Sequence, residues 1–302
     1  MATEAARRKA KVDPEFAYFR DRYAENMERM FAAVSDLYAR YWNDFFHFAL
    51  FEDGADDWEA AFGATHRKYA EALKVAEAAN VLDLACGRGG FAHFLSRSTS
   101  GNVLGIDISR SQLSQCSRFQ GPNLRFRHHD IMKADELQGR FDAVALLDAD
   151  CYLPDKRLAI AKIAKVMVPD GRFLLVSWCK RDGLGRAQEE LVLRPFMRYW
   201  GVPGLETPRR YRSHLERAGF RILAEEDLND RARPNWEFGY EQAIKGVREF
   251  SRQDAARLAW TGMALGADGI RLIKDQFPAA LYIKAGFDAG FLRYTYFLAE
   301  RR

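Results

Sequence analysis

The sequence feature that most constrains the fold is an apolar run that ends in a glycine-rich turn. Residues 80–90 read NVLDLACGRGG, and a helical pattern begins at Phe91. Glycine lets the backbone approach a bound ligand closely, and ligands of open α/β sheets bind beyond the carboxyl ends of the strands. The run therefore predicts a strand, a ligand-binding loop and a helix, in that order.

The chain beyond residue 80 alternates short apolar runs with helical segments, which is the pattern of βαβ units. Strands are expected near 80–85, 103–107, 124–128, 141–147, 171–177, 220–225 and 291–299, with the sequence PDG at 169–171 as a turn. A chain of 302 residues, 48% of them hydrophobic, can bury one large core. We expect a doubly wound α/β fold with a seven-stranded, mostly parallel sheet.

Two segments outside these strands predict helical additions to the core. Aromatic and apolar residues recur at helical spacing between Pro14 and Tyr41, so residues 1–70 are interpreted as an N-terminal helical arm or lid. The same arm offers a surface for a homo-oligomer. Residues 229–289 separate the last two strands, and a connection of that length usually covers a site. The core is then expected over 71–228 and 290–302, with 229–289 as a helical cap.

Charge and cysteine content exclude several classes of protein. The net charge of +4 is too weak to indicate a nucleic-acid partner. The four cysteines form no C-x-x-C pair, which argues against a zinc site and against a secreted disulfide scaffold. No apolar signal region and no apolar run of about eighteen residues occurs. The sequence predicts a cytoplasmic protein without a metal or a membrane span.

Acidic residues end the next two expected strands. Asp107 closes the run VLGID, where a ribose diol can donate hydrogen bonds to it, and Asp130 closes the third strand in HHDI. A competing interpretation is a nicotinamide site, because Gly87, Gly89 and Ala92 also satisfy the dinucleotide fingerprint G-x-G-x-x-(G/A). Asp83, four residues before Gly87, together with Asp130, favours a different cofactor.

The order D-x-(G/A)-C-G-x-G-G, then G-I-D, then H-D resembles the class I S-adenosylmethionine-dependent methyltransferases across about residues 80–180. The resemblance implies that the loop holds the methionine moiety, that Asp107 binds the ribose hydroxyls and that Asp130 reads the adenine amino group. Ala85 stands where that family more often has glycine. The cofactor implied is S-adenosyl-L-methionine. The residues expected to bind it are Tyr41, Asp83, Ala85, Gly87, Gly89, Asp107, Ile108, Gln112, Asp130, Ile131 and Leu147.

Two further segments resemble the sterol and tocopherol C-methyltransferases. Residues 148–155, DADCYLPD, are similar to E-(A/S)-x-C-H-x-P-D, with Asp148 at the glutamate position and Tyr152 at the histidine position. Residues 31–49 resemble the signature F-Y-x-x-x-W-x-x-S-F-H-F that precedes the core in that group. Prenyl diphosphate and terpenoid C-methyltransferases share this layout, so the resemblance implies an electron-rich alkene of a secondary-metabolite substrate as the nucleophile.

Methylation of an alkene leaves a carbocation, which can rearrange or cyclise. Aromatic faces stabilise such a cation, and a carboxylate can take a proton from it. The residues expected to contact a hydrophobic, prenylated substrate are Tyr38, Trp42, Phe46, Trp178, Trp200 and Trp236. Asp148 is the preferred base or cation stabiliser and Asp150 the second choice, with Tyr152 and His47 as hydrogen-bonding partners.

Three alternatives remain open at this point. Arginines cluster after the fifth strand and suit a substrate diphosphate or a solvated basic face; they are Arg194, Arg198, Arg209, Arg210 and Arg212. An N- or O-methyltransferase of a small amine or phenol would use Asp148 to bind an ammonium group. A cofactor-binding module would use its helical arm and cap for assembly.

Overall fold

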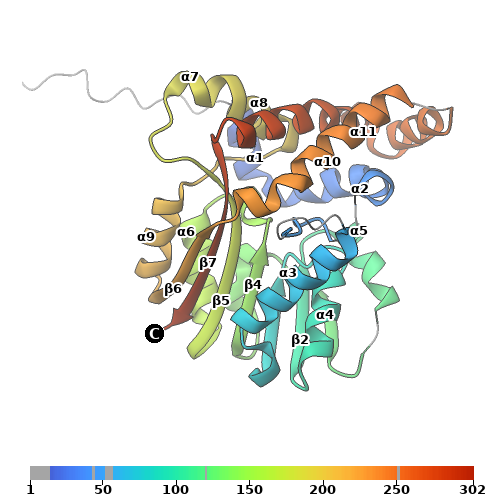
Figure 1. Cartoon of the computed structure of the whole chain (residues 1–302). Helices are drawn as coiled ribbons and strands as arrows, with labels where there is room; N and C mark the ends of the chain where they lie inside the picture. The colour runs from blue at the N-terminus through green and yellow to red at the C-terminus, as the bar shows by residue number, and fades with distance from the viewer. Residues whose placement is uncertain (1–13, 43–44, 52–56, 120, 250–251) are drawn as a thin grey trace, which may run out of the picture.

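A single mixed sheet of seven strands, in the order β3-β2-β1-β4-β5-β7-β6, forms the centre of the molecule (Figure 1). The structure is a computed structural model that describes residues 14–42, 45–51, 57–119, 121–249 and 252–302. The strands are β1 (Asn80–Leu84), β2 (Asn102–Asp107), β3 (Leu124–His128), β4 (Phe141–Leu147), β5 (Met167–Lys180), β6 (Phe220–Asp227) and β7 (Leu292–Arg301). Because β7 pairs antiparallel with both β5 and β6, the sheet is mostly parallel, and the predicted fold class is confirmed.

The fifth strand is longer than the sequence predicts. Its pairing with β7 continues from Arg172 opposite Glu300 to Lys180 opposite Leu292. The predicted turn at 169–171 lies inside the strand, where the register with β4 shifts and Asp170 adopts a left-handed φ of 60°. The PDG sequence therefore makes an irregularity within β5, because the backbone resumes pairing immediately after it.

Apolar clusters fill both faces of the sheet. One face is covered by α3 (Trp58–Ala72) and α4 (Gly90–Ser98), and the other by α6 (Lys156–Lys165) and α9 (Pro208–Arg217) (Figure 1). The predicted end of the arm at residue 70 falls within α3, which buries Tyr69 and Ala70 in the cluster that contains Val81 of β1. Helix α3 thus packs as part of the core.

The remaining helices lie across the carboxyl ends of the parallel strands (Figure 1). They are α1 (Pro14–Asp21), α2 (Tyr23–Tyr41), α5 (Arg110–Ser114), α7 (Arg186–Gln188), α8 (Arg194–Trp200), α10 (Asn229–Arg248) and α11 (Arg252–Asp288). Helix α2 packs against α11 and α5, so the arm and the cap meet above the sheet. Residues 1–13, 43–44 and 52–56 of the predicted arm, 120 of the core and 250–251 of the cap lie outside the described residues.

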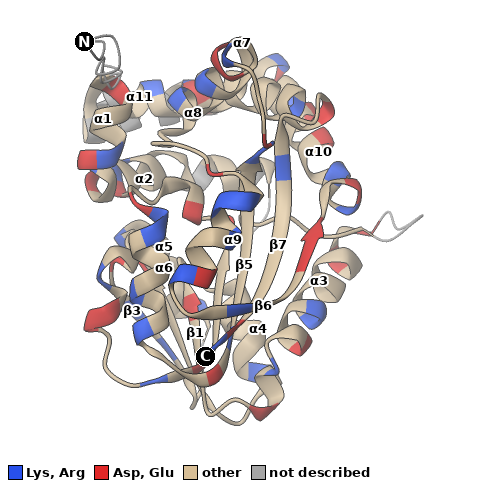
Figure 2. Ribbon diagram, turned by 90° about the vertical axis from the view of Figure 1, so that its left-hand side faces the viewer, with Lys and Arg blue, Asp and Glu red and all other residues tan. Residues whose placement is uncertain are grey.

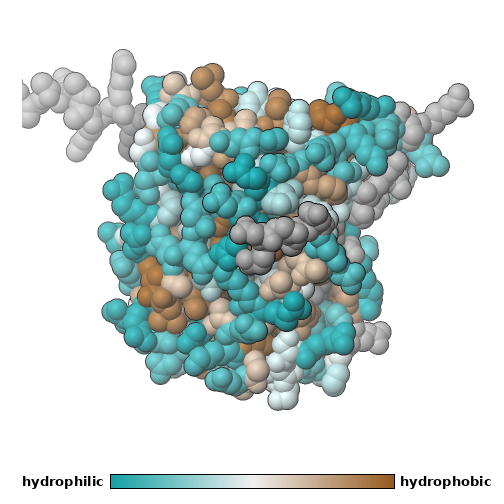
Figure 3. Space-filling view, viewed as in Figure 1, coloured by the Kyte–Doolittle hydropathy of each residue, from teal (hydrophilic) through white to brown (hydrophobic). Residues whose placement is uncertain are grey.

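The surface is mixed in charge and mainly polar. Figure 2 shows Lys, Arg, Asp and Glu interspersed over the outer helices, and the face in Figure 3 is mainly hydrophilic with small hydrophobic patches. Within the described residues, no helix is long and apolar enough to cross a membrane.

Candidate active site

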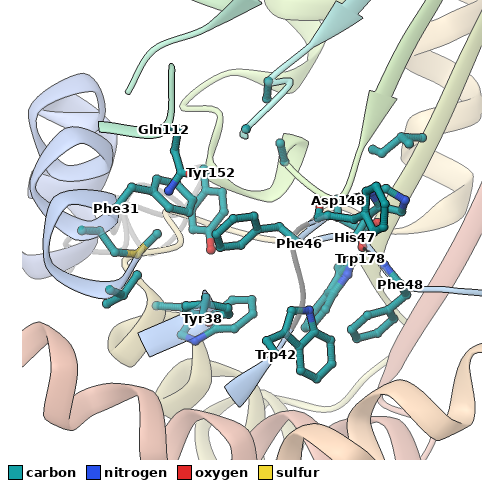
Figure 4. Close-up of a pocket in the computed structure, with 18 of the residues that line it drawn as sticks. Phe31, Tyr38, Trp42, Phe46, His47, Phe48, Gln112, Asp148, Tyr152 and Trp178 are labelled. Atoms are coloured by element: carbon teal, nitrogen blue, oxygen red, sulfur yellow. Dashed lines mark hydrogen bonds between the residues drawn. The ribbon is translucent and has the colours of Figure 1, made fainter. Parts of the chain in front are cut away.

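A deep pocket lies between the carboxyl ends of the strands and the helices above them (Figure 4). We call one part of its lining the acidic end, formed by Asp83, Ala85, Cys86, Gly87, Asp107, Ile108, Gln112 and Ile131. We call the other part the aromatic end, formed by Tyr38, Trp42, Phe46, Phe48, Trp178, Trp200, Trp236 and Tyr240. Strand β4 lies between β1 and β5 in the sheet, so Asp148, just after β4, stands where the two ends meet.

The loop after β1 has the left-handed backbone that its sequence predicts. Ala85 and Gly87 have φ values of 55° and 54°, and both line the pocket. A left-handed φ strains any residue with a Cβ, which explains why related loops favour glycine where this chain has Ala85. Gly89 lies outside the pocket lining. It is the N-cap of α4, and a Cβ there would stand 2.7 Å from the Phe126 ring.

Two buried carboxyl groups give the acidic end its character. Asp107 accepts hydrogen bonds from the backbone N–H groups of Gly87 at 2.9 Å and Ser109 at 2.8 Å. Burial raises the pKa of Asp107 to about 6, although both of these donors lower it. Burial, and then the charge of Asp107, raises the pKa of Asp83 to about 8, and its Oδ2 atom has no hydrogen-bond partner. A bound cation would compensate both groups, so this end fits a sulfonium cofactor with a ribose.

The third expected cofactor acid is turned toward the arm. Asp130 accepts hydrogen bonds from the Tyr23 hydroxyl and, at 2.7 Å, from the Met132 N–H, and it does not line the pocket. Its neighbour Ile131 does, and so does Tyr23. No local sequence pattern marks Tyr23 as a site residue, because only the packing of α2 on the core brings it to Asp130.

Asp148 is the carboxyl group at the centre of the pocket. It has a left-handed φ of 56°, its N–H donates to the Val176 carbonyl, and its Oδ2 accepts from the Phe48 N–H at 3.0 Å. Burial raises the pKa of Asp148 to about 8, against the effect of the nearby donors Tyr294, Phe48 and Trp178. A carboxyl group with this pKa can exchange a proton near neutral pH, as a catalytic acid or base must.

Asp150 lies outside the pocket lining. Its Oδ2 accepts hydrogen bonds from Ser177 at 2.7 Å and from the Tyr211 hydroxyl, and burial raises its pKa. Tyr211 belongs to the apolar cluster on the far face of the sheet. The structure therefore separates the two candidate bases, since Asp148 faces the pocket and Asp150 faces α9.

His47 and Tyr152 both line the pocket, but both ring nitrogens of His47 already have hydrogen-bond partners. Its Nδ1 lies 3.1 Å from the Phe45 carbonyl, which can only accept, and its Nε2 lies 2.9 Å from Nε2 of the buried His66. Burial lowers the pKa of His47 to about 4 and that of His66 to about 2. The pair is therefore neutral at neutral pH and holds the segment that precedes Phe48. The Tyr152 ring packs edge-on against Phe31 at 6.2 Å.

The aromatic end brings the arm, the sheet and the cap together (Figure 4). Tyr38 packs against Phe46 at 5.1 Å between ring centroids, and Trp178 packs against Phe48 at 4.9 Å and Trp200 at 5.3 Å. The cap is tied to this wall through Asn235 of α10, which exchanges hydrogen bonds with the backbone of Ala49 at 2.9 and 2.7 Å. All six side chains expected at the substrate lie in the pocket lining, and so do Tyr41 and Leu147.

Arginine and lysine are missing from the described lining of the pocket. The arginines of α9 point away from it and pair with surface acids. Arg209 pairs with Asp182 at 3.4 Å, Arg210 contacts Glu206 at 2.5 Å, and Arg212 contacts Glu225 at 2.8 Å. Among the described residues, no cluster of side chains could hold a metal ion. The charged groups of the pocket are thus carboxyl groups.

Residues 81–171 match a family model described as a methyltransferase domain. The sterol 24-C-methyltransferase of Kluyveromyces lactis is 29% identical over 216 residues, which cover 69% of this chain and 58% of that protein. The chain therefore spans less than two thirds of the length of this relative.

Two solved structures share the fold. A cyclopropane synthase from Mycobacterium tuberculosis matches with a TM-score of 0.73 and 17% identity, covering 92% of this chain and 98% of that one. A geranyl diphosphate C-methyltransferase from Streptomyces coelicolor, solved with Mg²⁺, geranyl diphosphate and S-adenosyl-L-homocysteine, matches with a TM-score of 0.63 and 14% identity, covering 88% and 97%. At these identities the likeness is one of fold.

The raised pKa of Asp148 predicts a pH-dependent contribution to stability. The folded state keeps this proton up to about pH 8, whereas the unfolded chain releases it near pH 4, so the contribution is lost as the pH rises between these values. The difference in unfolding free energy between wild type and Asp148→Asn should fall by about 1.4 kcal/mol per pH unit in this window. Urea unfolding from about pH 5 to about pH 8 measures it.

Asp230→Asn, at an exposed position of α10, is the matched control and should leave the wild-type pH dependence unchanged. A difference between wild type and Asp148→Asn that stays constant across the pH range would contradict the burial argument.

Proposed function

Because the chain is a class I S-adenosylmethionine-dependent methyltransferase, we propose that it methylates a carbon atom of an electron-rich alkene in an isoprenoid or terpenoid natural product. The observation that carries the proposal is the half-buried Asp148 carboxyl group, whose Oδ1 atom is fully enclosed, between the acidic end and the aromatic end of the pocket. The bound cofactor supplies an electrophilic methyl group on a positively charged sulfur. The chain must therefore place an alkene carbon beside that methyl group and tolerate the cation that results.

The aromatic end supports the second of these tasks. Electron-rich ring faces attract a cation by about 2 kcal/mol or more when the site is desolvated. Tyr38 and Trp42 offer such faces from α2 and its C-cap and Trp178 from β5, and none of the described lining residues is a lysine or arginine that would repel a positive charge. The ring packing keeps the faces in place, because each ring contacts at least one other aromatic side chain.

Asp148 supports the final step. Loss of a proton from the carbon next to the cation breaks a C–H bond, and its electron pair forms the new double bond. The carboxylate of Asp148 accepts the proton. Positive charge in the pocket favours the ionised carboxylate, so binding of the cofactor prepares this group to act as a base.

The residues of the lining also indicate whether the substrate is charged. A diphosphate is recognised by cationic side chains or through a metal ion. The described lining has no lysine or arginine, and no cluster of described side chains could hold a metal ion. An apolar, uncharged isoprenoid suits the aromatic walls better. The sterol substrate named for the Kluyveromyces lactis relative is of this chemical kind.

An N- or O-methyltransferase is the second candidate function, because Asp148 and the aromatic faces would also suit a substrate ammonium group. The two candidates differ in the atom that receives the label. Methyl-labelled cofactor should give a product with the label on carbon, and label on nitrogen or oxygen would refute C-methylation.

Replacement of Asp148 should separate binding from chemistry. With a sterol that has a side-chain double bond as the probe, Asp148→Asn should lower turnover by about 100-fold or more. Affinity for S-adenosylhomocysteine, measured by calorimetry, should change little, because the isosteric amide leaves the loop after β1 intact. Asp148→Glu should recover part of the turnover, because it restores a carboxylate at this position. Equal turnover in wild type and Asp148→Asn would remove Asp148 from the mechanism.

The arginines of α9 should be dispensable. A double Arg209→Ala, Arg210→Ala variant should keep the apparent substrate affinity of the wild type, because both side chains lie on the surface and pair with acids there. A steady-state KM for the same sterol probe and for geranyl diphosphate tests this. A marked rise in KM for geranyl diphosphate alone would indicate a diphosphate site.

A further inference from the structure

Helix α2 of the arm is bonded to the segments that follow three strands at the acidic end of the pocket. The Ser35 carbonyl accepts a hydrogen bond from the Arg88 side chain, in the loop after β1. The Glu28 carboxylate accepts one at 2.7 Å from the Arg110 N–H, after β2, and Tyr23 donates one to the segment after β3. The arm therefore docks on the part of the core where the cofactor is expected.

Gln112 lies between α2 and the pocket. It is 1% exposed and lines the acidic end, and Figure 4 shows its side chain beside α2. Its Nε2 atom donates a hydrogen bond to the Ser35 hydroxyl oxygen at 2.6 Å. Its amide oxygen, Oε1, is buried and has no hydrogen-bond partner among the described residues. Because a buried acceptor without a partner is costly, this oxygen marks a position for a donor group of a ligand.

The Ser35 hydroxyl group determines which way the Gln112 amide faces. It donates its only hydrogen to the Phe31 carbonyl, one turn earlier in α2. Its oxygen can then only accept, so the NH₂ group of Gln112 must face Ser35 and the amide oxygen must face away from it. Without this hydroxyl group the amide could turn around, because its two ends have nearly the same shape. Ser35 is not part of the pocket lining and reaches the pocket through Gln112.

An outward-facing amide oxygen suits the other polar groups of the acidic end, which are carboxyl groups. Oδ2 of Asp83 has no partner among the described residues, and Asp107 lies on the same short turn as Gln112. The Ser109 hydroxyl oxygen holds that turn by accepting from the Gln112 N–H at 3.4 Å. These acceptors match a ligand that is rich in donors, and S-adenosylmethionine has donors in its ribose hydroxyl, adenine amino and ammonium groups. An NH₂ group in place of the amide oxygen would face donors with a donor.

We propose that Ser35 is a positioning residue of the cofactor site, which holds the Gln112 amide oxygen toward the pocket so that it accepts a hydrogen bond from S-adenosylmethionine. The inference rests on the cofactor and holds whatever the substrate. The cofactor site is then complete only when α2 is docked on the core. Since the same helix carries Tyr38 of the aromatic end, cofactor binding also stabilises one wall of the substrate end.

An isosteric pair of substitutions tests the role of the Ser35 hydroxyl group. Threonine and valine are both β-branched and have nearly the same shape, but only threonine keeps the hydroxyl group. Calorimetry should give Ser35→Val an affinity for S-adenosylhomocysteine about tenfold below that of Ser35→Thr, because the amide is no longer held in one orientation. Ser114→Ala, which removes an exposed hydroxyl group of α5, is the matched control and should bind like wild type.

A double-mutant cycle separates positioning of the amide from packing of the helix. In a Gln112→Met background, which lacks the amide, Ser35→Val and Ser35→Thr should differ in affinity by less than about twofold. A difference of the same size in both backgrounds would assign Ser35 to helix packing and overturn the inference. Equal affinities of Ser35→Val and Ser35→Thr with Gln112 in place would also overturn it. No substrate is used, so failure of the wild type to form a C-methylated product would count against the proposed function alone.

Discussion

The hydrogen bond from the Phe48 N–H to Asp148, at 3.0 Å, is the contact on which the site depends. It joins the segment after α2 to the end of β4, two parts of the chain that are 100 residues apart in sequence. Asp148 can receive it because its left-handed backbone turns the carboxyl group off the sheet and into the pocket. Tyr38 and Trp42 of the arm and Trp178 of the sheet line the pocket near this bond. Asn235 of the cap also lines it and accepts a hydrogen bond from the Ala49 N–H.

The charged groups of the pocket lining favour the binding of a cation. Its described lining carries the carboxyl groups of Asp83, Asp107 and Asp148 without a lysine or arginine, and burial keeps their protons on to an unusually high pH. Such a site disfavours anions and gains from any cation that enters it, whether a sulfonium or a substrate carbocation. Burial of these acids therefore costs folding stability near neutral pH, and a cation bound beside them offsets that cost.

The sequence predicts correctly which site residues lie together when they are at the ends of neighbouring parallel strands. Asp83 and Asp107 end adjacent parallel strands, which must meet at one edge of the sheet, so their proximity follows from the fold class. Asp150 shows the limit of such reasoning. It follows Asp148 by two residues, but it binds Ser177, whose side chain lies on the opposite face of β5 from that of Trp178. Tyr294 stands opposite Trp178 only through the antiparallel register of β7 with β5, for which the local sequence carries no signal.

The central claim is that the pocket stabilises a cation beside Asp148, and binding of a cation mimic tests it most directly. With S-adenosylhomocysteine bound, the affinity of a tertiary amine that carries its ammonium nitrogen at the cation position is compared with that of the neutral carbon isostere. The ammonium compound should bind at least about tenfold more tightly, and Asp148→Asn should abolish most of that preference. Equal affinities for the two compounds in the wild type would contradict the account.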